Sequence, residues 1–403
     1  MNMKNGYQFI KRILPVMVIG LALYACDTPE SASLFDEDYQ SLPAPVISSV
    51  SPDGGYFAGY QEIVITGSNF TSDLSKLFVY FNDTRVNILS ASETQIVVRT
   101  PNLVADSIGI KVSVLGVEAF SNSWEYSLDA LFYDAVSFPD NENPWAAARD
   151  SDGNYYVSYE ASGAPAGVKK VAADGTVIDP TFGSAQSWFY RSAKVGPDGG
   201  VYLVRGGAVP FIYRIDPTGG TPASWARGIG RTEDLTFDES GNAWSGGTNE
   251  GNTSNAKLNR INPAGVAVRF DFDAQIYALA YFDNHIYVAG TRGSDSYVWR
   301  VELLADLIPG AEQEVANLTA SGAVGRPTAL AVAGDGTAFV GMDGANQLYS
   351  VSSTGTVAET YPGIVPGTIL KMEYVPNSQN ILMTVTTTDG NRVLELNVQK
   401  DAP

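Results

Sequence analysis

Aromatic and basic residues recur along the second half of the chain at positions from which they could bind one ligand together. Aromatic side chains stack on the C–H faces of sugar rings, and the arginine guanidinium donates several hydrogen bonds to hydroxyl groups or carboxylates. Basic groups gathered at one place in an acidic chain would suit a sugar or an anionic polysaccharide. The candidate ligand-binding residues are Trp145, Tyr190, Arg191, Arg231, Tyr277 and Arg326.

Two other interpretations of the same segments stay open. The aromatic residues could be wedges packed between structural units, with the arginines paired to nearby acids such as Glu233 and Asp234. Asn143, Glu233 and Asp234 could instead supply oxygen ligands to a divalent cation. The surrounding arginines and Lys371 oppose a cation, so we expect no metal, no cofactor and no catalytic residue.

Several kinds of chemistry are excluded by the counts of reactive residues and by the charge. The chain has one cysteine, Cys26, and one histidine, His285, so it forms no internal disulfide and no zinc site built from cysteine and histidine. It has no phosphate-binding loop and no catalytic-triad motif. The formal net charge of -19 repels phosphate backbones, and we therefore expect no nucleic-acid partner.

The candidate residues belong to a unit that repeats six times from Trp145 onward. Each unit reads as a strand, a tight turn, a second strand, a gap and a third strand. Glycines 175, 219, 265 and 355 follow the third strands and lie 44, 46 and 90 residues apart, which gives a period of about 45 residues. Such a period with three or four strands is typical of propeller blades. The first turns fall at 151–154, 197–200, 239–242, 282–285, 334–337 and 376–379.

The ends of the repeat series predict how the ring closes. The last repeat stops soon after its third strand, and residues 131–137 form an unassigned strand before the first repeat. We expect residues 131–137 to become the outer strand of the sixth blade, which removes an exposed sheet edge. The third strands are expected at 168–171, 212–215, 258–261, 298–301, 348–351 and 393–396.

The repeats resemble those of NHL-type six-bladed propellers. The resemblance rests on an apolar strand, an Asp-Gly turn and then an aromatic strand such as residues 154–157 (NYYV) or 337–340 (TAFV). It implies an all-β C-terminal domain, a six-bladed β-propeller, over residues 129–403. Some six-bladed propellers are lactonases that hold a divalent cation on Glu, Asn and Asp, so a metal-dependent lactonase-like enzyme is one hypothesis for this chain.

Residues 44–128 predict a separate domain of short alternating strands. Residues 45–52 (PVISSVSP), 63–70 (IVITGSNF) and 96–101 (IVVRTP) stand in the order found in IPT/TIG domains. The resemblance implies an N-terminal immunoglobulin-like sandwich, which in this family most often acts as a spacer. Ile63 and Ile65 should face the core, Gly67 should supply a turn or a bulge, and Phe70 should return to the core.

The N-terminus reads as an export signal. Lys4, Lys11 and Arg12 precede an uncharged, mostly apolar run at 13–25, a length suited to a signal peptide. Residues 23–26 (LYAC) resemble a bacterial lipobox, which implies cleavage after residue 25 and lipidation, including palmitate, of Cys26. Residues 26–43 read as a flexible, acidic tether. Without residues 1–25 the chain has 22 basic and 44 acidic residues, a net charge of -22.

The three segments together resemble outer-membrane lipoproteins of Bacteroidota that are often associated with polysaccharide uptake. The resemblance implies a lipid-anchored protein of the cell outer membrane that binds a polysaccharide or oligosaccharide through the loop face of the propeller. An adhesion module that binds an envelope protein partner is the alternative. A lactonase-like enzyme is the third hypothesis.

Overall fold

The computed structural model describes residues 42–54, 56–184, 188–206, 211–227, 229–248, 257–344 and 347–403. These residues form strands and connecting loops, and the helical element among them is a single 3-10 turn, η1 (Ala305–Leu307). The predicted all-β fold class is therefore confirmed. The predicted signal peptide, Cys26 and the tether up to residue 41 lie outside the described residues. Two compact units are formed, of which the second contains residues 127–403 together with 54–62 and 100–107.

The residues before 129 form an immunoglobulin-like sandwich of two sheets. The first sheet has the order β1 (Val46–Ser51), β3 (Glu62–Ser68), β7 (Gln95–Arg99) and β6 (Ile88–Ala91). The second has the order β2 (Tyr56–Phe57), β9 (Trp124–Asp129), β8 (Ala105–Val114), β4 (Leu77–Phe81) and β5 (Thr84–Arg85). Ile63 and Ile65 of β3 are fully buried and Phe70 is nearly so, whereas Val64 on the opposite face is partly exposed. The predicted half-buried strand is confirmed.

Gly67 has a different role from the turn or bulge expected of it. It lies inside β3, and the extra residue of the neighbouring bulge is on β1, between Ile47 and Ser49. A Cβ atom on Gly67 would lie 1.9 Å from the carbonyl oxygen of Val46 and 2.5 Å from Cζ of Phe70. Glycine is required there because the neighbouring backbone and the Phe70 ring leave no room for a side chain.

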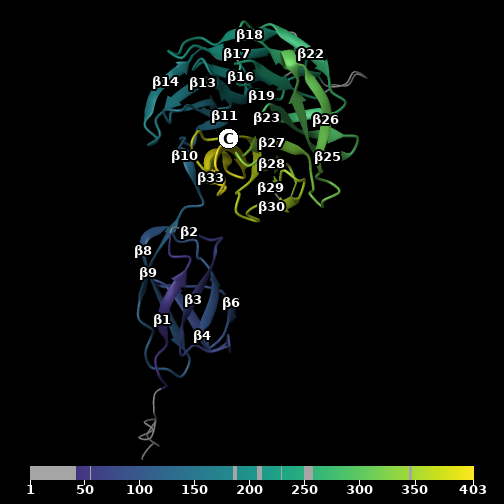
Figure 1. Cartoon of the computed structure of the whole chain (residues 1–403). Helices are drawn as coiled ribbons and strands as arrows, with labels where there is room; N and C mark the ends of the chain where they lie inside the picture. Colours follow the sequence, from purple (N-terminus) through teal and green to yellow (C-terminus); the bar gives the residue numbers. More distant parts are fainter. Residues whose placement is uncertain are drawn as a thin grey trace, which may run out of the picture. The chain divides into compact units, whose positions relative to one another are not determined.

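Residues 132–397 form six four-stranded sheets that follow one another around a ring (Figure 1). The first five run from the innermost strand outward in chain order. Blade one is β11 (Glu142–Arg149), β12 (Tyr155–Ala161), β13 (Ala164–Val171) and β14 (Val177–Gly183). Blade two is β15 (Tyr190–Val195), β16 (Val201–Arg205), β17 (Phe211–Ile215) and β18 (Ala223–Arg227). Blade three is β19 (Asp234–Phe237), β20 (Ala243–Gly246), β21 (Lys257–Ile261) and β22 (Ala267–Asp271).

The remaining blades include the one that closes the ring. Blade four is β23 (Gln275–Phe282), β24 (His285–Arg292), β25 (Asp295–Leu303) and β26 (Pro309–Asn317). Blade five is β27 (Pro327–Val332), β28 (Ala338–Met342), β29 (Leu348–Val351) and β30 (Val357–Glu359). Blade six is β31 (Thr368–Tyr374), β32 (Asn380–Thr387), β33 (Gly390–Asn397) and β10 (Phe132–Val136). Every predicted third strand is present, and β10 pairs with β33 as the outer strand, so the predicted closure is confirmed.

The repeated glycines are explained by the turns they occupy. Gly153 and Gly241 each donate their backbone N–H to the residue three positions earlier, with φ of 89° and 78°. Residues other than glycine rarely adopt a positive φ, because the Cβ atom clashes with the backbone. In blade four the same turn is built from Asp283 and Asn284, both with positive φ, so the repeat continues there without a glycine.

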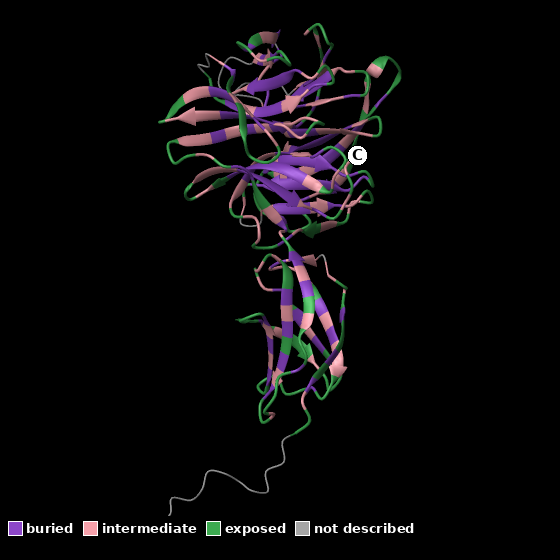
Figure 2. Cartoon of the chain, turned by 90° about the vertical axis from the view of Figure 1, so that its left-hand side faces the viewer, coloured by how far each residue is buried: buried purple, intermediate pink, exposed green. Residues whose placement is uncertain are grey.

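The core of the propeller consists of six apolar clusters, one for each pair of neighbouring blades. One cluster joins blades six and one through Val136 of β10, Val157 of β12 and Val393 of β33. Figure 2 shows this burial as buried stretches along the strands with exposed connecting loops. Because each blade buries both faces against its neighbours, loss of one blade would expose apolar surface on the two blades beside it. No described segment forms a helix with the length and apolar content needed to cross a bilayer.

Candidate functional site

The same backbone irregularity occurs in the innermost strand of five blades, and blade three has a residue in the equivalent position. A β-bulge interrupts the pairing at one residue in five of the six innermost strands. In blade three, Glu233 donates its N–H to Gly246 O at 2.8 Å, and Asp234 pairs with the same Gly246, so Glu233 holds the equivalent position. Bulges change the direction of a side chain and are frequent beside functional sites. The six residues at this position are Trp145, Arg191, Glu233, Tyr277, Thr328 and Leu370.

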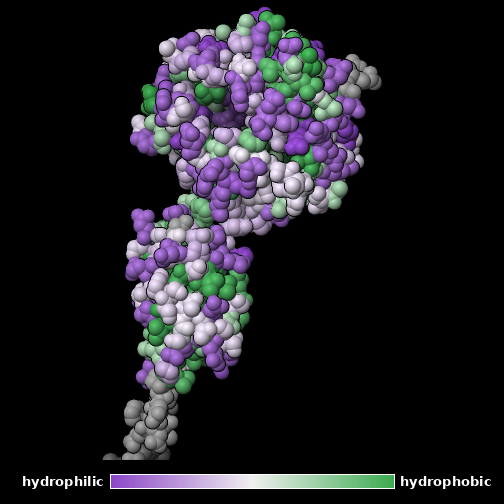
Figure 3. Space-filling view, viewed as in Figure 1, coloured by the Kyte–Doolittle hydropathy of each residue, from purple (hydrophilic) through white to green (hydrophobic). Residues whose placement is uncertain are grey.

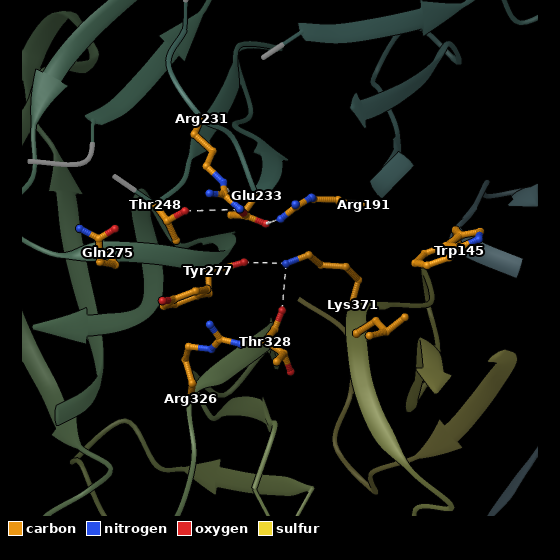
Figure 4. Close-up of a pocket in the computed structure, with 11 residues that line it drawn as sticks. Trp145, Arg191, Arg231, Glu233, Thr248, Gln275, Tyr277, Arg326, Thr328 and Lys371 are labelled. Atoms are coloured by element: carbon orange, nitrogen blue, oxygen red, sulfur yellow. Dashed lines mark hydrogen bonds and ion pairs between the residues drawn. The ribbon is translucent and has the colours of Figure 1, made fainter. Parts of the chain in front are cut away.

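All six bulge residues line one cavity of about 620 Å³. Figure 4 shows Trp145, Arg191, Glu233, Tyr277 and Thr328 around this space, each on a different blade. The space-filling view shows that the middle of the propeller is hollowed and that its visible walls are mostly hydrophilic (Figure 3). We call this space the central cavity. The other residues that line it are Arg231, Thr248, Gln275, Arg326 and Lys371.

The structure brings five of the six predicted ligand-binding residues together in the central cavity, and Tyr190 is the exception. Tyr190 immediately precedes the bulge, so its side chain turns away from Arg191 into the interface between blades one and two. It is 2% exposed and its ring lies 6.0 Å from that of Tyr213. The expectation that Tyr190 binds a ligand is therefore wrong, because its aromatic ring is covered on all sides by protein.

Glu233 joins two arginines from neighbouring blades. Its Oε2 accepts a hydrogen bond from Nη1 of Arg191, and its Oε1 accepts one from Nε of Arg231 at 2.9 Å. The hydroxyl of Thr248 lies 3.5 Å from the same Oε1. The Glu233 side chain is largely buried, and ion pairs of this kind fix the direction of a planar guanidinium. The part of the alternative interpretation that paired arginines with Glu233 is therefore correct for these two residues.

Lys371 places an ammonium group between blades four and five. Its Nζ donates to the carbonyl oxygens of Tyr277, at 2.6 Å, and Thr328, at 2.9 Å (Figure 4). Burial lowers the pKa of Lys371 below its ordinary value, while the carboxylates of Asp234 and Glu233 act in the opposite direction. The ammonium group of Lys371 thus lies at the cavity wall, and its contacts with the protein do not fully replace the water that it loses on burial.

Arg326 and Tyr277 form a second polar and aromatic group at the cavity. Arg326 pairs with Asp343 at 3.0 Å, and its guanidinium carbon lies 5.0 Å from the centre of the Tyr277 ring. The Arg326 side chain remains 54% exposed. On the opposite side, Trp145 lies 5.3 Å from the exposed ring of Phe189. The cavity therefore presents aromatic surfaces and cationic donors together.

Beneath the cavity, a buried carboxylate connects three blades. Oδ1 of Asp234 accepts a 2.6 Å hydrogen bond from the Ser192 hydroxyl, and Oδ2 accepts one at 3.1 Å from the backbone N–H of Leu279. Asp234 thus has a role in holding blades two, three and four together.

Farther along the inner strands, Lys194 pairs with Glu373 at 2.8 Å. Burial raises the pKa of the Glu373 carboxyl, and the Lys194 ammonium opposes that shift.

The three residues considered as cation ligands are not arranged for that purpose. Asn143 does not line the cavity, because its amide is bound to Glu160 and to the backbone N–H of Asn391. Asp234 is occupied as described, and Glu233 is neutralised by two arginines. Within the described part of the chain, no group of three or more His, Cys, Asp or Glu side chains is placed to hold a metal ion.

Comparisons with known proteins find one matching domain family and several proteins of similar fold. The IPT/TIG domain profile matches residues 45–128. No curated protein matches the chain. An auxiliary nutrient binding protein from Bacteroides thetaiotaomicron is 13% identical with a TM-score of 0.52, over 89% of this chain and 99% of that one. A putative phosphatase from the same species is 11% identical with a TM-score of 0.53, over 88% and 97%.

A gluconolactonase from Xanthomonas campestris is also similar, at 16% identity and a TM-score of 0.50, over 73% of this chain and 90% of that one. At these identities the similarity establishes a shared fold. The fold is therefore found both in a nutrient binding protein and in a gluconolactonase.

Proposed function

We propose that this protein is a non-catalytic accessory binding protein of the bacterial cell envelope and that it binds an oligosaccharide or polysaccharide in the central cavity. The observation that carries the proposal is the ring of bulges, which turns one side chain from every blade toward the same space. A cavity of about 620 Å³ lies within the range of roughly 300–1,000 Å³ that is common for small-molecule sites.

The chemistry of the lining supports a sugar. Trp145 and Tyr277 offer flat apolar faces, which stack on sugar rings. Gln275, Thr248 and the arginines offer donors and acceptors for ring hydroxyls. The existence of an auxiliary nutrient binding protein of similar fold supports a binding role.

Attachment to the outer membrane is part of the same proposal. It rests on the lipobox-like residues 23–26 and on the origin of the similar nutrient binding protein in Bacteroides. Acyl chains on Cys26 would anchor the protein, since each buried methylene contributes roughly 0.8 kcal/mol. The acidic segment that follows would then act as a tether, and the IPT/TIG domain as a spacer.

A protein partner is the second candidate, and exposed aromatic residues favour it. Trp188 and Phe189 are 41% and 39% exposed, and the guanidinium carbon of Arg205 lies 3.2 Å from the centre of the Trp188 ring. Exposed tryptophan and arginine side chains are enriched where proteins bind one another. In this version the propeller is an adhesion module and the rim beside Trp145 contacts the partner.

Binding to an array of polysaccharides tests the proposal, with Trp145→Ala and Tyr277→Ala as the site variants. We expect each variant to lose at least about ten-fold in affinity for the glycan that wild type binds. Phe120→Ala removes an exposed aromatic ring from the sandwich domain and is the matched control. Binding that is equal in all four proteins would place the glycan outside the central cavity. No binding to any glycan would overturn the sugar proposal and favour the protein partner.

A further inference from the structure

We infer that the sugar bound in the central cavity is acidic, with its carboxylate or sulfate group held by Arg191, Lys371 and Arg326. This inference rests on the proposed function and names the class of ligand. It follows from the charge of the cavity, from hydrogen-bond donors left without acceptors and from the partial burial of the cations.

The cavity is positive although the protein is acidic. Its lining has four cations, Arg191, Arg231, Arg326 and Lys371, and one carboxylate, Glu233. Asp343, which pairs with Arg326, and the buried Asp234 bring the total to four cations and three carboxylates, a net charge of +1. The whole chain carries -19. A positive cavity of this kind concentrates anions locally and repels other cations.

Donors remain available after the internal pairs are counted. Arg191 uses Nη1 for Glu233, and no described residue accepts a hydrogen bond from its Nε or Nη2. Lys371 uses two of the three N–H bonds of its ammonium group, and no described acceptor binds the third. Arg191 remains 38% exposed at the cavity, so a ligand can reach it. Two residues from different blades thus present unsatisfied cationic donors to one space.

An anion satisfies these donors better than a neutral hydroxyl does. The guanidinium group binds a carboxylate or sulfate through two parallel hydrogen bonds, and each charge-assisted bond is roughly twice as strong as a neutral one. No described carboxylate forms an ion pair with Lys371, because both hydrogen bonds of its ammonium group go to backbone carbonyl oxygens. Glu233 is a positioning residue here, since it holds Arg191 and Arg231 at the cavity wall.

The test compares oligosaccharides of a uronic acid with their carboxyl-reduced, neutral counterparts by titration calorimetry on the whole protein. A third ligand set carries sulfate esters on the neutral sugars, and inorganic sulfate and citrate serve as sugar-free anions. We expect the uncharged oligosaccharides to bind about ten-fold more weakly or worse than one of the acidic sets. We also expect the affinity for the acidic set to fall as salt rises from about 50 to 300 mM.

Variants assign the effect to residues. Lys371→Met and Arg326→Gln should abolish most of the difference between acidic and neutral ligands. Arg300→Gln removes the same charge from a residue outside the cavity, bound to Gln313, and should leave the difference unchanged. Thermal unfolding checks that each variant is folded, and the exposed Arg326 gives a second measurement if Lys371→Met is unstable.

The outcomes separate the inference from the proposed function. Neutral and acidic oligosaccharides of equal affinity would overturn the acidic class and leave glycan binding standing. Sulfate or citrate bound as tightly as the acidic sugars would support an anion site and overturn the glycan function. No binding of any of these ligands would overturn both.

Discussion

The hydroxyl group of Tyr133 donates a 2.6 Å hydrogen bond to Oε2 of Glu395, which lies 262 positions later in the chain. Glu395 is fully buried and accepts further hydrogen bonds from Tyr155, Arg149 and Asn380. Tyr133 is on the first strand of the propeller sequence and Glu395 on the last. The ring is therefore closed by a polar contact as well as by strand pairing and apolar packing.

Removal of the Tyr133 hydroxyl should destabilise the ring without altering its packing. We expect Tyr133→Phe to lower the free energy of unfolding by about 1.5–3 kcal/mol, since a buried carboxylate loses a donor. Urea unfolding measures the change. Tyr213→Phe is the control, because the Tyr213 hydroxyl bonds to no described residue. A change of equal size in the control would show that Tyr133 has no special role in closure.

The same contact should make stability depend on alkaline pH. Burial, followed by the hydrogen bond to Glu395, raises the pKa of Tyr133 to about 12 from its ordinary value of 10.0. Since the folded-state pKa is the higher one, the stabilisation is complete below pH 10 and is lost as the pH rises toward 12. The difference in unfolding free energy between wild type and Tyr133→Phe should shrink over that interval. A difference that is constant up to pH 12 would contradict the assignment.

Two adjacent residues should respond to substitution in opposite ways. Tyr190→Ala empties a core position and should cost about 3–5 kcal/mol of stability, while the affinity of the folded fraction stays unchanged. Arg191→Gln should leave stability within about 1 kcal/mol and weaken ligand binding. Chemical unfolding and calorimetry on both variants check this. Loss of affinity in the Tyr190 variant at full folding would mean that the bulge does not separate the two roles.

Gly247 packs against the backbone of the segment of blade three that carries Arg231, where a side chain has no room. A Cβ atom on Gly247 would lie 1.8 Å from the carbonyl oxygen of Arg231. Gly247→Ala should therefore displace Arg231 and Glu233, lower affinity and cost about 1–3 kcal/mol of stability. At Gly310 the nearest atom to an added Cβ is 3.3 Å away, so Gly310→Ala should have a smaller effect and leave binding intact.

Lipid attachment can be tested independently of the fold. Cys26→Ser removes the thiol of the proposed lipobox, and the protein should move from the membrane fraction to the soluble fraction. Incorporation of labelled palmitate into wild type, and none into the variant, gives a second measurement. Membrane association that survives the substitution would refute the lipobox interpretation.

The sequence allowed the blades to be predicted because their signals are local. Turn glycines such as Gly153 need a positive φ, and β10 was recognisable as the strand missing from blade six. The site is predicted less well from the sequence. A bulge shifts by one residue the side chains that face each side of a strand, and no particular residue type marks the position of a bulge. The six bulge positions hold Trp, Arg, Glu, Tyr, Thr and Leu. The sequence alone therefore places Tyr190 in the cavity, gives no role to Gln275 and does not identify Thr248.

In the inner strands the main chain forms the sheet, and the side chains at the bulges line the central cavity. The ladder on either side of each bulge depends on peptide groups, which every residue possesses. The bulge side chains line the cavity and belong to none of the apolar clusters between blades, although Thr328 and Glu233 also bond to a neighbouring blade. A descendant of this protein could therefore exchange one ligand for another by point mutations at six positions, while its scaffold is inherited unchanged.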